Sequence, residues 1–408
     1  MNMQWQSLRY AWKNVWRNRR RSMTTAGITA ISVCGLLFFG GFVLYTYQSL
    51  EEFSARSQGH VIIAHTDYFE QEEDSPMSLG LDGWQAIRKA LQQDDGVRRV
   101  LPRIQFSGLI SNGEKSTIFI AEGVDAGYEF TVTGPFMQVS KGDVLSPVPG
   151  ELPQIMLGQG VAKNLKVHPG DIVTLLATTS DGALNGIDVQ VVGIFGTGMP
   201  ELDARKVMVG LDTAQELLNS ERISTLSVYL RKTSSTLAYQ QTVQQHYPSV
   251  ATRNWSDLAF FYHKVRDLYS RVFTVVGLVI VIVVMLSVAN TMSMAVIERT
   301  REIGTLAALG TLPAEMLKNF VLEAMIIGAL GSFIGMLLAG LITLYLSMNV
   351  VMMPPPPGMT EGYPLAIAFS LPMYASTCLV MIVVTILGGL FAARKGVKRP
   401  IVEALAHV

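Results

Sequence analysis

The stretch at residues 272–310, "VFTVVGLVIVIVVMLSVANTMSMAVIERTREIGTLAALG", decides the fold because it joins a long apolar run to a short charged segment. Residues 272–297 contain no Asp, Glu, Lys or Arg, and about 20 apolar residues suffice for a helix to cross a bilayer. The following residues, "ERTRE" at 298–302, carry four charges, and a new apolar run begins near residue 320. We therefore predict that the chain leaves the membrane here, forms a short connection and enters it again.

Four runs of this kind occur in the chain, at 23–50, 272–297, 320–347 and 365–392. A buried core helix is the alternative for each, but the length and low charge of the runs favour membrane spans. Residues 51–268 lie between the first two runs. The predicted fold class is a membrane protein with four transmembrane α-helices and a large α+β extracytoplasmic domain between helices 1 and 2.

Positive charges predict the orientation of the spans, since Lys and Arg concentrate on the cytoplasmic side. Three segments carry them: 1–22 before the first span, 298–318 between spans two and three, and the tail at 393–408. The Pro-rich loop at 348–364 has no Lys or Arg. We predict a multi-pass membrane protein with both termini and the 298–318 link in the cytoplasm, and with 51–268 and 348–364 outside.

The N-terminal segment 1–22 has the pattern of an amphipathic helix lying at the cytoplasmic interface. Its apolar residues recur at helical spacing opposite its cations; they are Trp5, Leu8, Trp12, Val15 and Trp16. An unstructured basic tail is the alternative. The apolar run that follows is longer than the apolar region of a signal peptide, so we expect an uncleaved signal anchor.

Charge and cysteine content exclude some functions. Lys plus Arg and Asp plus Glu number 32 each, so the chain has no overall positive charge that would attract nucleic acid. The two cysteines, Cys34 and Cys378, both fall within apolar runs. The segment 51–268 therefore has no internal disulfide, and its hydrophobic core must stabilise it.

The segment 51–268 has a mixed pattern of short strands and helices. Strands are predicted by runs such as "GHVIIAH", "STIFIAEGV" and "IDVQVVGIF", and helices by "GWQAIRKALQQ" and "LDTAQELLNS". Because strands and helices do not alternate regularly, we expect an α+β domain with two lobes.

We find no motif for catalysis or metal binding in this segment. His60 and His65 are an odd number of residues apart, which places them on opposite faces of a strand. "GEKST" at 113–117 lacks the earlier glycine of a phosphate-binding loop, and no G-x-S-x-G occurs. No pair of carboxylates stands out. We therefore predict a non-catalytic chain without catalytic or metal-ligating residues.

The link at 298–318 is predicted to contain a short amphipathic helix. Ile303, Leu306, Ala307 and Gly310 recur at positions i, i+3, i+4 and i+7, which forms an apolar stripe. Gly310 is suited to end this helix, and Pro313 to begin the next. The link is too short to have a core of its own, so its stripe must pack on the bilayer surface, on the rest of the chain or on a partner protein.

Several segments resemble one family of membrane proteins. The link and the start of the third span, "ERTREIGTLAALGTLPAEMLKNFVLEA" at 298–324, resemble the signature segment of FtsX-like ABC transporter permeases. Three further segments are similar to elements of that superfamily in the same order: "AWKNVWRNRRRS" at 11–22, "VQVVGIFGTGMPELDARKVMVGLDTAQELL" at 189–218 and "ARKGVKRPIVEAL" at 393–405. The segment at 189–218 looks like the outer domain of MacB-type and lipoprotein-releasing (Lol-type) permeases, and the lipoprotein-releasing type is the nearest in architecture. The resemblance implies a location in the bacterial inner membrane.

The resemblance implies that the charged link is a coupling helix that docks on a separate ABC ATPase subunit, present as a dimer. The sequence contains no G-x-x-x-x-G-K-[ST], so we expect no cofactor in this chain, with ATP and Mg bound by the ATPase. An ordinary solvated link is the alternative. The expected contact residues are Arg299, Glu302, Ile303, Gly304, Leu306 and Leu309.

Two classes of function follow from the resemblance. The first is a permease that uses ATP hydrolysis to act on lipoprotein, lipid or amphiphilic cargo outside the membrane. The second is a transducer that activates an outer partner, such as a cell-wall hydrolase, without moving a substrate. Expected partners besides the ATPase are membrane lipids, a second permease copy or a paralogous permease, and an outer adaptor, chaperone or lipoprotein.

Three features within and beside the last two spans complete the predictions. Gly331 and Gly335 form G-x-x-x-G, which allows helices to approach closely within the bundle or in a dimer. Glu323 is expected to extend its carboxylate to the membrane interface. Pro354–Pro357 is expected to form a stiff polyproline spacer.

Overall fold

The structure, a computed structural model, describes residues 2–71, 73, 75–134, 137–148, 150–355, 360 and 362–397, without the side chains of 2–8, 307 and 395–397. The chain divides into two compact units. We call Met1–Tyr47, Val265–Met352 and Pro364–Val408 the helical bundle, and Gln48–Lys264 with Met353–Tyr363 the sheet domain. The C-terminal motif from residue 398 onward lies outside the described residues.

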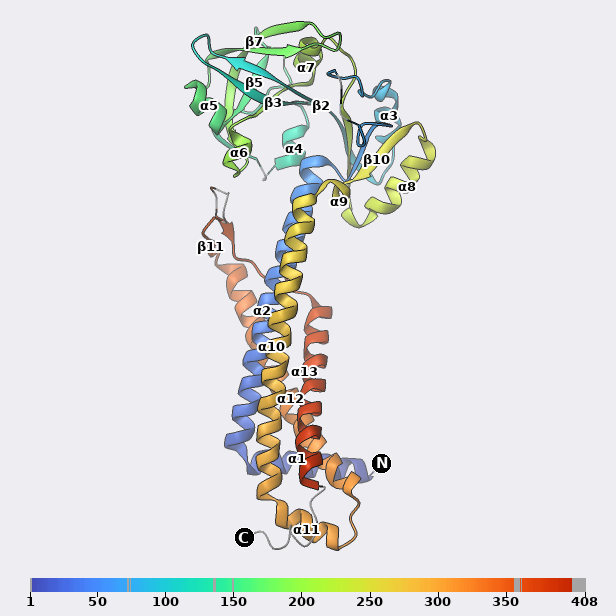
Figure 1. Cartoon of the computed structure of the whole chain (residues 1–408), viewed down its shortest axis with the longest axis vertical. Coiled ribbons are helices and arrows are strands. Elements are labelled where there is room, and N and C mark those ends of the chain that lie inside the picture. The colour runs from blue at the N-terminus through green and yellow to red at the C-terminus, as the bar shows by residue number, and fades with distance from the viewer. Residues whose placement is uncertain are drawn as a thin grey trace. The chain divides into compact units, whose positions relative to one another are not determined.

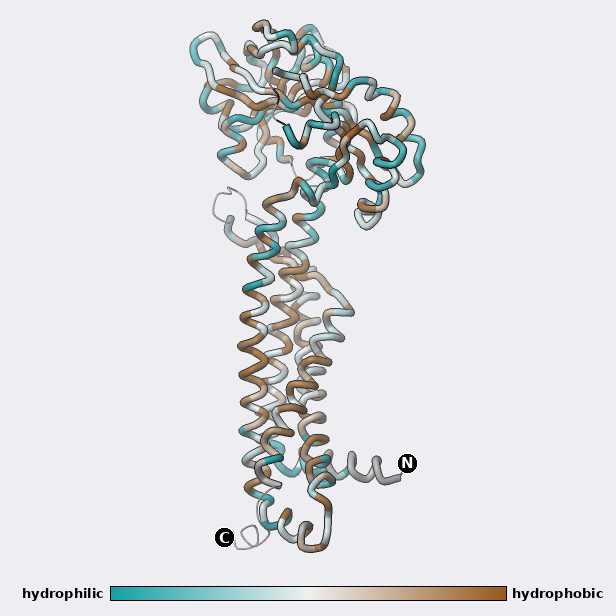
Figure 2. Tube along the Cα trace, turned by 45° about the vertical axis from the view of Figure 1, so that its right-hand side comes forward, coloured by the Kyte–Doolittle hydropathy of each residue, from teal (hydrophilic) through white to brown (hydrophobic). Residues whose placement is uncertain are grey.

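The helical bundle is built from long apolar helices (Figure 1). Four helices in the described part of the chain are long and apolar enough to span a membrane, which confirms the predicted class. Figure 2 shows their hydrophobic residues along the bundle. The elements are α1 (Asn2–Arg17), α2 (Arg19–Gln58), α10 (Phe260–Glu298), α11 (Thr300–Ala308), α12 (Pro313–Met348) and α13 (Leu371–Val397).

Two of these helices extend well beyond the apolar runs of the sequence. α2 continues to Gln58, and α10 begins at Phe260 rather than near residue 272. The added turns contain charged residues that favour helix, and Arg56 pairs with Glu52 one turn earlier at 2.6 Å. The apolar run predicts the part of each helix that can lie in lipid, but it does not predict where the helix begins or ends.

The helix α1 lies across the end of the bundle where α2 begins (Figure 1). Ala11, Asn14 and Val15 are buried, whereas Trp12 and Trp16 are exposed. The predicted apolar stripe is therefore divided, with Val15 buried and both indoles exposed. The side chains of Trp5 and Leu8 lie outside the described residues.

The sheet domain contains one ten-stranded mixed sheet in the order β10-β1-β9-β2-β3-β8-β5-β7-β4, with β6 pairing with β2 and β7. The pairs β3–β8 and β5–β7 are parallel, and the other pairs are antiparallel. This sheet is continuous across the region where we expected two lobes. The strands are β1 (Val61–His65), β2 (Val97–Ser111), β3 (Ser116–Val124), β4 (Gln138–Gly142), β5 (Gln154–Gly158), β6 (Ile172–Thr178), β7 (Leu184–Gly196), β8 (Lys206–Gly210), β9 (Thr225–Leu230) and β10 (Val250–Asn254).

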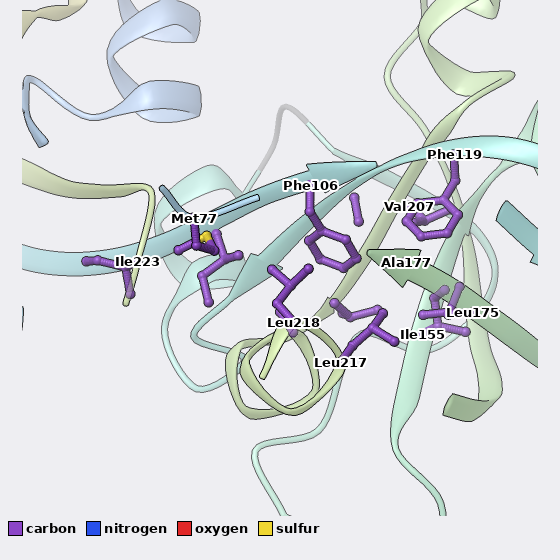
Figure 3. Packing of buried hydrophobic residues seen from close by; sticks show 14 of the residues in the cluster. Met77, Phe106, Phe119, Ile155, Leu175, Ala177, Val207, Leu217, Leu218 and Ile223 are labelled. Atoms are coloured by element: carbon purple, nitrogen blue, oxygen red, sulfur yellow. The ribbon is translucent and has the colours of Figure 1, made fainter. Parts of the chain in front are cut away.

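Short helices cover this sheet and complete its core. In Figure 3, Leu217 and Leu218 of α7 lie next to Phe106 and Ile155 of the sheet. Phe106 and Phe119 make an edge-to-face contact with ring centroids 5.7 Å apart. The helices are α3 (Trp84–Leu91), α4 (Glu129–Thr133), α5 (Gln159–Leu165), α6 (Pro200–Asp203), α7 (Leu211–Leu218), α8 (Thr236–His246) and α9 (Trp255–Leu258), with a 3-10 turn at Thr233–Ser235.

The connection between α12 and α13 contains two short strands, β11 (Met352–Met353) and β12 (Tyr363–Pro364). Within the sheet domain, the backbone N–H of Thr360 donates to the carbonyl of Gly198 at 2.9 Å. Residues 356–359 are not described. The predicted polyproline spacer at Pro354–Pro357 therefore lies partly outside the described residues.

Candidate functional site

The candidate site is the junction of α10, α11 and α12. α10 ends at Glu298, and α11 follows within two residues. Gly310 has a φ of 88°, a left-handed conformation that glycine adopts without steric strain. Leu312 is extended at the start of α12, and Pro313 occupies the first turn, where its missing N–H is not needed. These local preferences produce the short helix that the sequence pattern predicts.

One face of α11 packs against the bundle itself. Ile303 and Gly304 are buried. Ile303 forms a cluster with Val296 of α10 and with Met316 and Phe320 of α12. The apolar stripe is therefore partly covered by the chain's own helices, and α11 is held to the bundle by hydrophobic contacts.

The end of α11 and the residues after it present leucines to the surroundings. Leu306, Leu309 and Leu312 are 42%, 79% and 64% exposed, and we call them the exposed leucines. The N–H of Leu309 bonds to the carbonyl of Thr305, so the helical turn continues and Leu306 and Leu309 share a face. Large exposed apolar residues grouped in this way are typical of a surface that binds a partner protein or a membrane.

A buried polar network lies behind α11. Oε1 of Glu323, in α12, accepts hydrogen bonds from Arg299 Nη1 at 2.8 Å and from Asn14 Nδ2 at 2.7 Å. All three residues are buried. A single carboxylate oxygen thus joins α1, the start of the link and α12. Buried charges of this kind are retained only when they are paired.

This network bears on two sequence-based expectations. The carboxylate of Glu323, expected to extend to the membrane interface, is bonded within the bundle by Asn14 and Arg299. The guanidinium of Arg299, expected to contact the ATPase, faces Glu323 and is buried, and its contact with a partner stays a prediction.

Two further ion pairs link α11 and the end of α10 to the N-terminal cations. Arg21 meets Glu298 at 2.6 Å, and Arg17 lies 3.6 Å from Glu302. Both pairs are substantially exposed, so each contributes little to stability. A hollow of about 480 Å³ lies beside them, lined by Tyr10, Leu306 and Lys318 among others.

The glycine motif of α12 packs within the bundle. A Cβ atom at Gly331 would lie 2.7 Å from Thr29 Cβ and 2.8 Å from the Ala26 carbonyl oxygen. At Gly335 it would lie 2.5 Å from the Ala30 carbonyl oxygen. These neighbours all belong to α2. Of the two alternatives left open by the sequence, the structure therefore shows packing inside the bundle.

The sheet domain contains a second buried network around Arg103. Its guanidinium donates to the carboxylate of Glu129, to the carbonyl of Ser57 near the end of α2 and to the hydroxyl of Tyr229. It also forms an ion pair with Glu122 at 3.0 Å, and Lys206 pairs with the same carboxylate at 3.0 Å. These paired carboxylates were not predictable from the sequence, because their partners come from distant segments.

The charges of this network determine how its acids ionise. Burial alone would raise the pKa of Glu122, but Lys206 and Arg103 lower it to about 2. Burial raises the pKa of Glu129, although Arg103 opposes the shift. Each carboxylate faces a cation, which is typical of a structural network. In the part of the chain that the structure describes, no group of three metal-ligating side chains is positioned to hold a metal ion.

Comparison with known proteins assigns the family. Residues 22–246 match the MacB-like periplasmic core domain, and residues 274–401 match the FtsX-like permease C-terminal domain. The chain belongs to the FtsX-like, MacB-type family of ABC transporter permeases. The resemblance seen in the sequence is thereby confirmed.

Individual relatives of this permease are distant in sequence. It is 26% identical to the lipoprotein-releasing system transmembrane protein LolE of Haemophilus influenzae over 65% of each chain. It is 22% identical to LolC of Neisseria meningitidis serogroup B over 81% of this chain and 79% of that one. The periplasmic region of MacB from Actinobacillus actinomycetemcomitans matches 50% of this chain and 93% of its own, with 13% identity and a TM-score of 0.35.

Family and helices together define the setting of the permease. Four candidate membrane helices and the family indicate a multi-pass inner-membrane protein within an ABC transporter system that has an ATPase partner. Of the six residues expected to contact that partner, Glu302, Leu306 and Leu309 are exposed, and Arg299, Ile303 and Gly304 are buried.

Sequence reasoning missed Leu312 and Asn14 at this site, and it did not identify the partners of Glu323. Leu312 falls outside the i, i+3, i+4 stripe because Gly310 ends the helix before it. Asn14 and Glu323 were not connected, since they are 309 residues apart. The only available signal was a carboxylate in an apolar run, which usually indicates a buried partner.

Proposed function

We propose that this permease couples ATP hydrolysis in a separate ATPase dimer to work on a lipoprotein, lipid or amphiphilic cargo outside the membrane. The supporting observation is that the apolar stripe of the link is only partly covered. Ile303 fixes α11 to the bundle, and the exposed leucines that follow it in the chain have no such cover. This is the surface that a docked ATPase would cover. The ATPase, rather than this chain, would bind ATP and Mg.

The buried network provides the rigid attachment that such coupling requires. When the ATPase moves α11, Arg299 at its base pulls on Glu323 of α12 through a short, charge-assisted hydrogen bond. Asn14 transmits the same displacement to α1. The termini and α11 would therefore lie in the cytoplasm, as the distribution of Lys and Arg in the sequence also predicts.

The cargo class rests on the relatives. LolE and LolC are named as transmembrane proteins of lipoprotein-releasing systems, which favours a lipidated or amphiphilic substrate. A second permease, identical or paralogous, would complete a transporter driven by two ATPase subunits. An outer adaptor or chaperone would receive the cargo.

The exposed leucines provide the test. The full-length chain carrying Leu306→Glu and Leu309→Glu is expressed with an affinity tag in its native cells, and co-purifying ABC ATPase is quantified by mass spectrometry. Because both side chains are exposed, the variant is expected to fold, and burying a charge at the contact is expected to reduce ATPase recovery about tenfold or more. Leu184→Glu in the sheet domain, where Leu184 is also exposed, is the matched control. Full ATPase recovery with the double variant would refute the docking surface.

A further inference from the structure

A second cavity in the helical bundle is almost entirely apolar. It has a volume of about 810 Å³ and lies between α1, α12 and α13. Met325, Ala329 and Phe333 of α12 form one wall, and Ile382 of α13 contributes to the other. Residues 325 and 333 are two turns apart, so this groove extends about 12 Å along α12. Because these residues of α12 belong to a candidate membrane span, the groove is expected to face lipid.

The part of the groove next to α1 is lined by side chains that carry cations. Arg9 and Lys13 line it mainly through their apolar stems, together with Trp12. Arg9 and Lys13 are four residues apart and therefore share a face of the helix. Within the described part of the chain, neither cation makes an ion pair, whereas Arg17 and Arg21 on the same segment are paired with Glu302 and Glu298.

No carboxylate is among the described residues that line the groove. An occupant must then be apolar along most of its length and negatively charged at one end. Trp12 also lines the groove, and tryptophan is a side chain that membrane proteins place at headgroup depth. A phospholipid with an anionic headgroup has this combination of properties, and basic pockets between membrane helices bind such headgroups.

We propose that this groove is a binding site for an anionic phospholipid. One acyl chain lies along Met325, Ala329 and Phe333, and the phosphate headgroup interacts with Arg9 and Lys13. The site is separate from the exposed leucines and does not depend on the identity of the cargo. Asn14, next to Lys13, bonds to Glu323, so a bound lipid would hold α1 in the position where it completes the buried network.

The proposed site predicts that an anionic lipid is retained more strongly than a zwitterionic one. Each cation near an anionic headgroup strengthens binding, and two cations predict an anionic preference of about tenfold or more. The full-length chain is reconstituted in nanodiscs of equal phosphatidylglycerol and phosphatidylcholine. It is then released into mild detergent, and the retained lipids are counted by native mass spectrometry.

Three variants separate a specific site from general contact with lipid. Arg9→Gln with Lys13→Gln is expected to lower phosphatidylglycerol retention about tenfold and to leave phosphatidylcholine unchanged. Arg19→Gln with Arg20→Gln removes two nearby exposed cations that do not line the groove and is expected to have no effect. Ala329→Trp is expected to fill the groove and reduce retention of both lipids, without disturbing the core, because Ala329 is exposed.

Three results would overturn the proposal. Equal phosphatidylglycerol loss from both double variants would mean that lipid responds to overall charge. Unchanged retention with Ala329→Trp would mean that the acyl chain lies elsewhere. Loss of a second copy of this chain, rather than of lipid, on substitution of Arg9 and Lys13 would identify the groove as a protein interface.

Discussion

Arg299 and Glu323 meet at 2.8 Å, with only 8% and 4% of their side chains exposed. The pair connects the beginning of the link at 298–318 to α12, and Asn14 extends the connection to α1. A buried ion pair adds little net stability, but removing one partner leaves an uncompensated charge. The value of this pair therefore lies in fixing the geometry of three helices at the base of α11.

Removing one member of this pair is expected to destabilise the permease strongly. Glu323→Ala leaves the Arg299 guanidinium buried and unpaired, which costs about 3–5 kcal/mol. Replacing both residues by methionine is expected to restore most of the lost stability, because no buried charge remains. Thermal unfolding in detergent measures both effects. Glu298→Ala, which breaks the exposed pair with Arg21, is the control and is expected to cost less than about 1 kcal/mol. Equal costs for the two alanine variants would contradict the role of burial.

The contact between α12 and α2 predicts opposite effects for two glycines of one helix. Gly331→Ala places a Cβ atom against Thr29 and the backbone of Ala26, and such overpacking is expected to destabilise the bundle by about 1–3 kcal/mol. At Gly340 nothing lies within 4 Å of an added Cβ. Gly340→Ala is expected to be neutral or to stabilise by up to about 1 kcal/mol. Melting temperatures of the two variants test this, and shifts of the same sign would argue against close packing at Gly331.

Arg103 is expected to be indispensable for the sheet domain. Arg103→Leu leaves Glu122 and Glu129 without their shared cation, at a cost of about 3–5 kcal/mol. Arg103→Lys is not expected to restore stability, since an ammonium group cannot reproduce the several directed contacts of a guanidinium. Limited proteolysis of the full-length chain measures the loss of stability. Arg205→Leu, which replaces an exposed arginine, is the control. Resistance equal to the wild type in Arg103→Leu would refute this prediction.

His60 is expected to make the sheet domain less stable in acid. Its Nδ1 accepts the backbone N–H of Leu230 at 3.2 Å, and burial together with Arg56 and Arg98 lowers its pKa from 6.5 to about 4. Above pH 6.5 the ring is neutral in both states, so stability does not change. Between pH 6.5 and 4 only the unfolded chain takes up the proton, and stability falls by about 2 kcal/mol at pH 5.

The measurement compares unfolding at pH 7.5 and pH 5 in the wild type and in His60→Asn. The asparagine oxygen retains an acceptor near Nδ1 but does not titrate. The variant is therefore expected to lose the part of the pH dependence that His60 causes. The same pH dependence in both proteins would exclude His60 as its source.

The sequence predicts the membrane part of this fold well because its signals are local. Apolar length identifies all four candidate spans, and the spacing of Ile303 and Leu306 predicts the short helix of the link. Which residues of that apolar stripe are covered and which are exposed was not predictable. It depends on Met316 and Phe320 of α12, whose position follows from tertiary packing.

The buried polar networks also could not be predicted from the sequence, because their members meet only through tertiary packing. Glu323 and Asn14 are 309 residues apart, and Arg103 and Tyr229 are 126 apart. A single sequence shows that a charged residue lies in an apolar setting, but it does not identify the partner. The order of strands in the sheet depends on equally distant pairings, such as β2 with β9.

The first and last strands of the sheet domain are direct neighbours. Val61 of β1 pairs with Asn254 of β10, and the two strands are antiparallel. The segment between them thus begins and ends at one place, as inserted modules do. Such a module is suited to exchange between related permeases as a cassette, while the membrane helices that receive it keep their architecture.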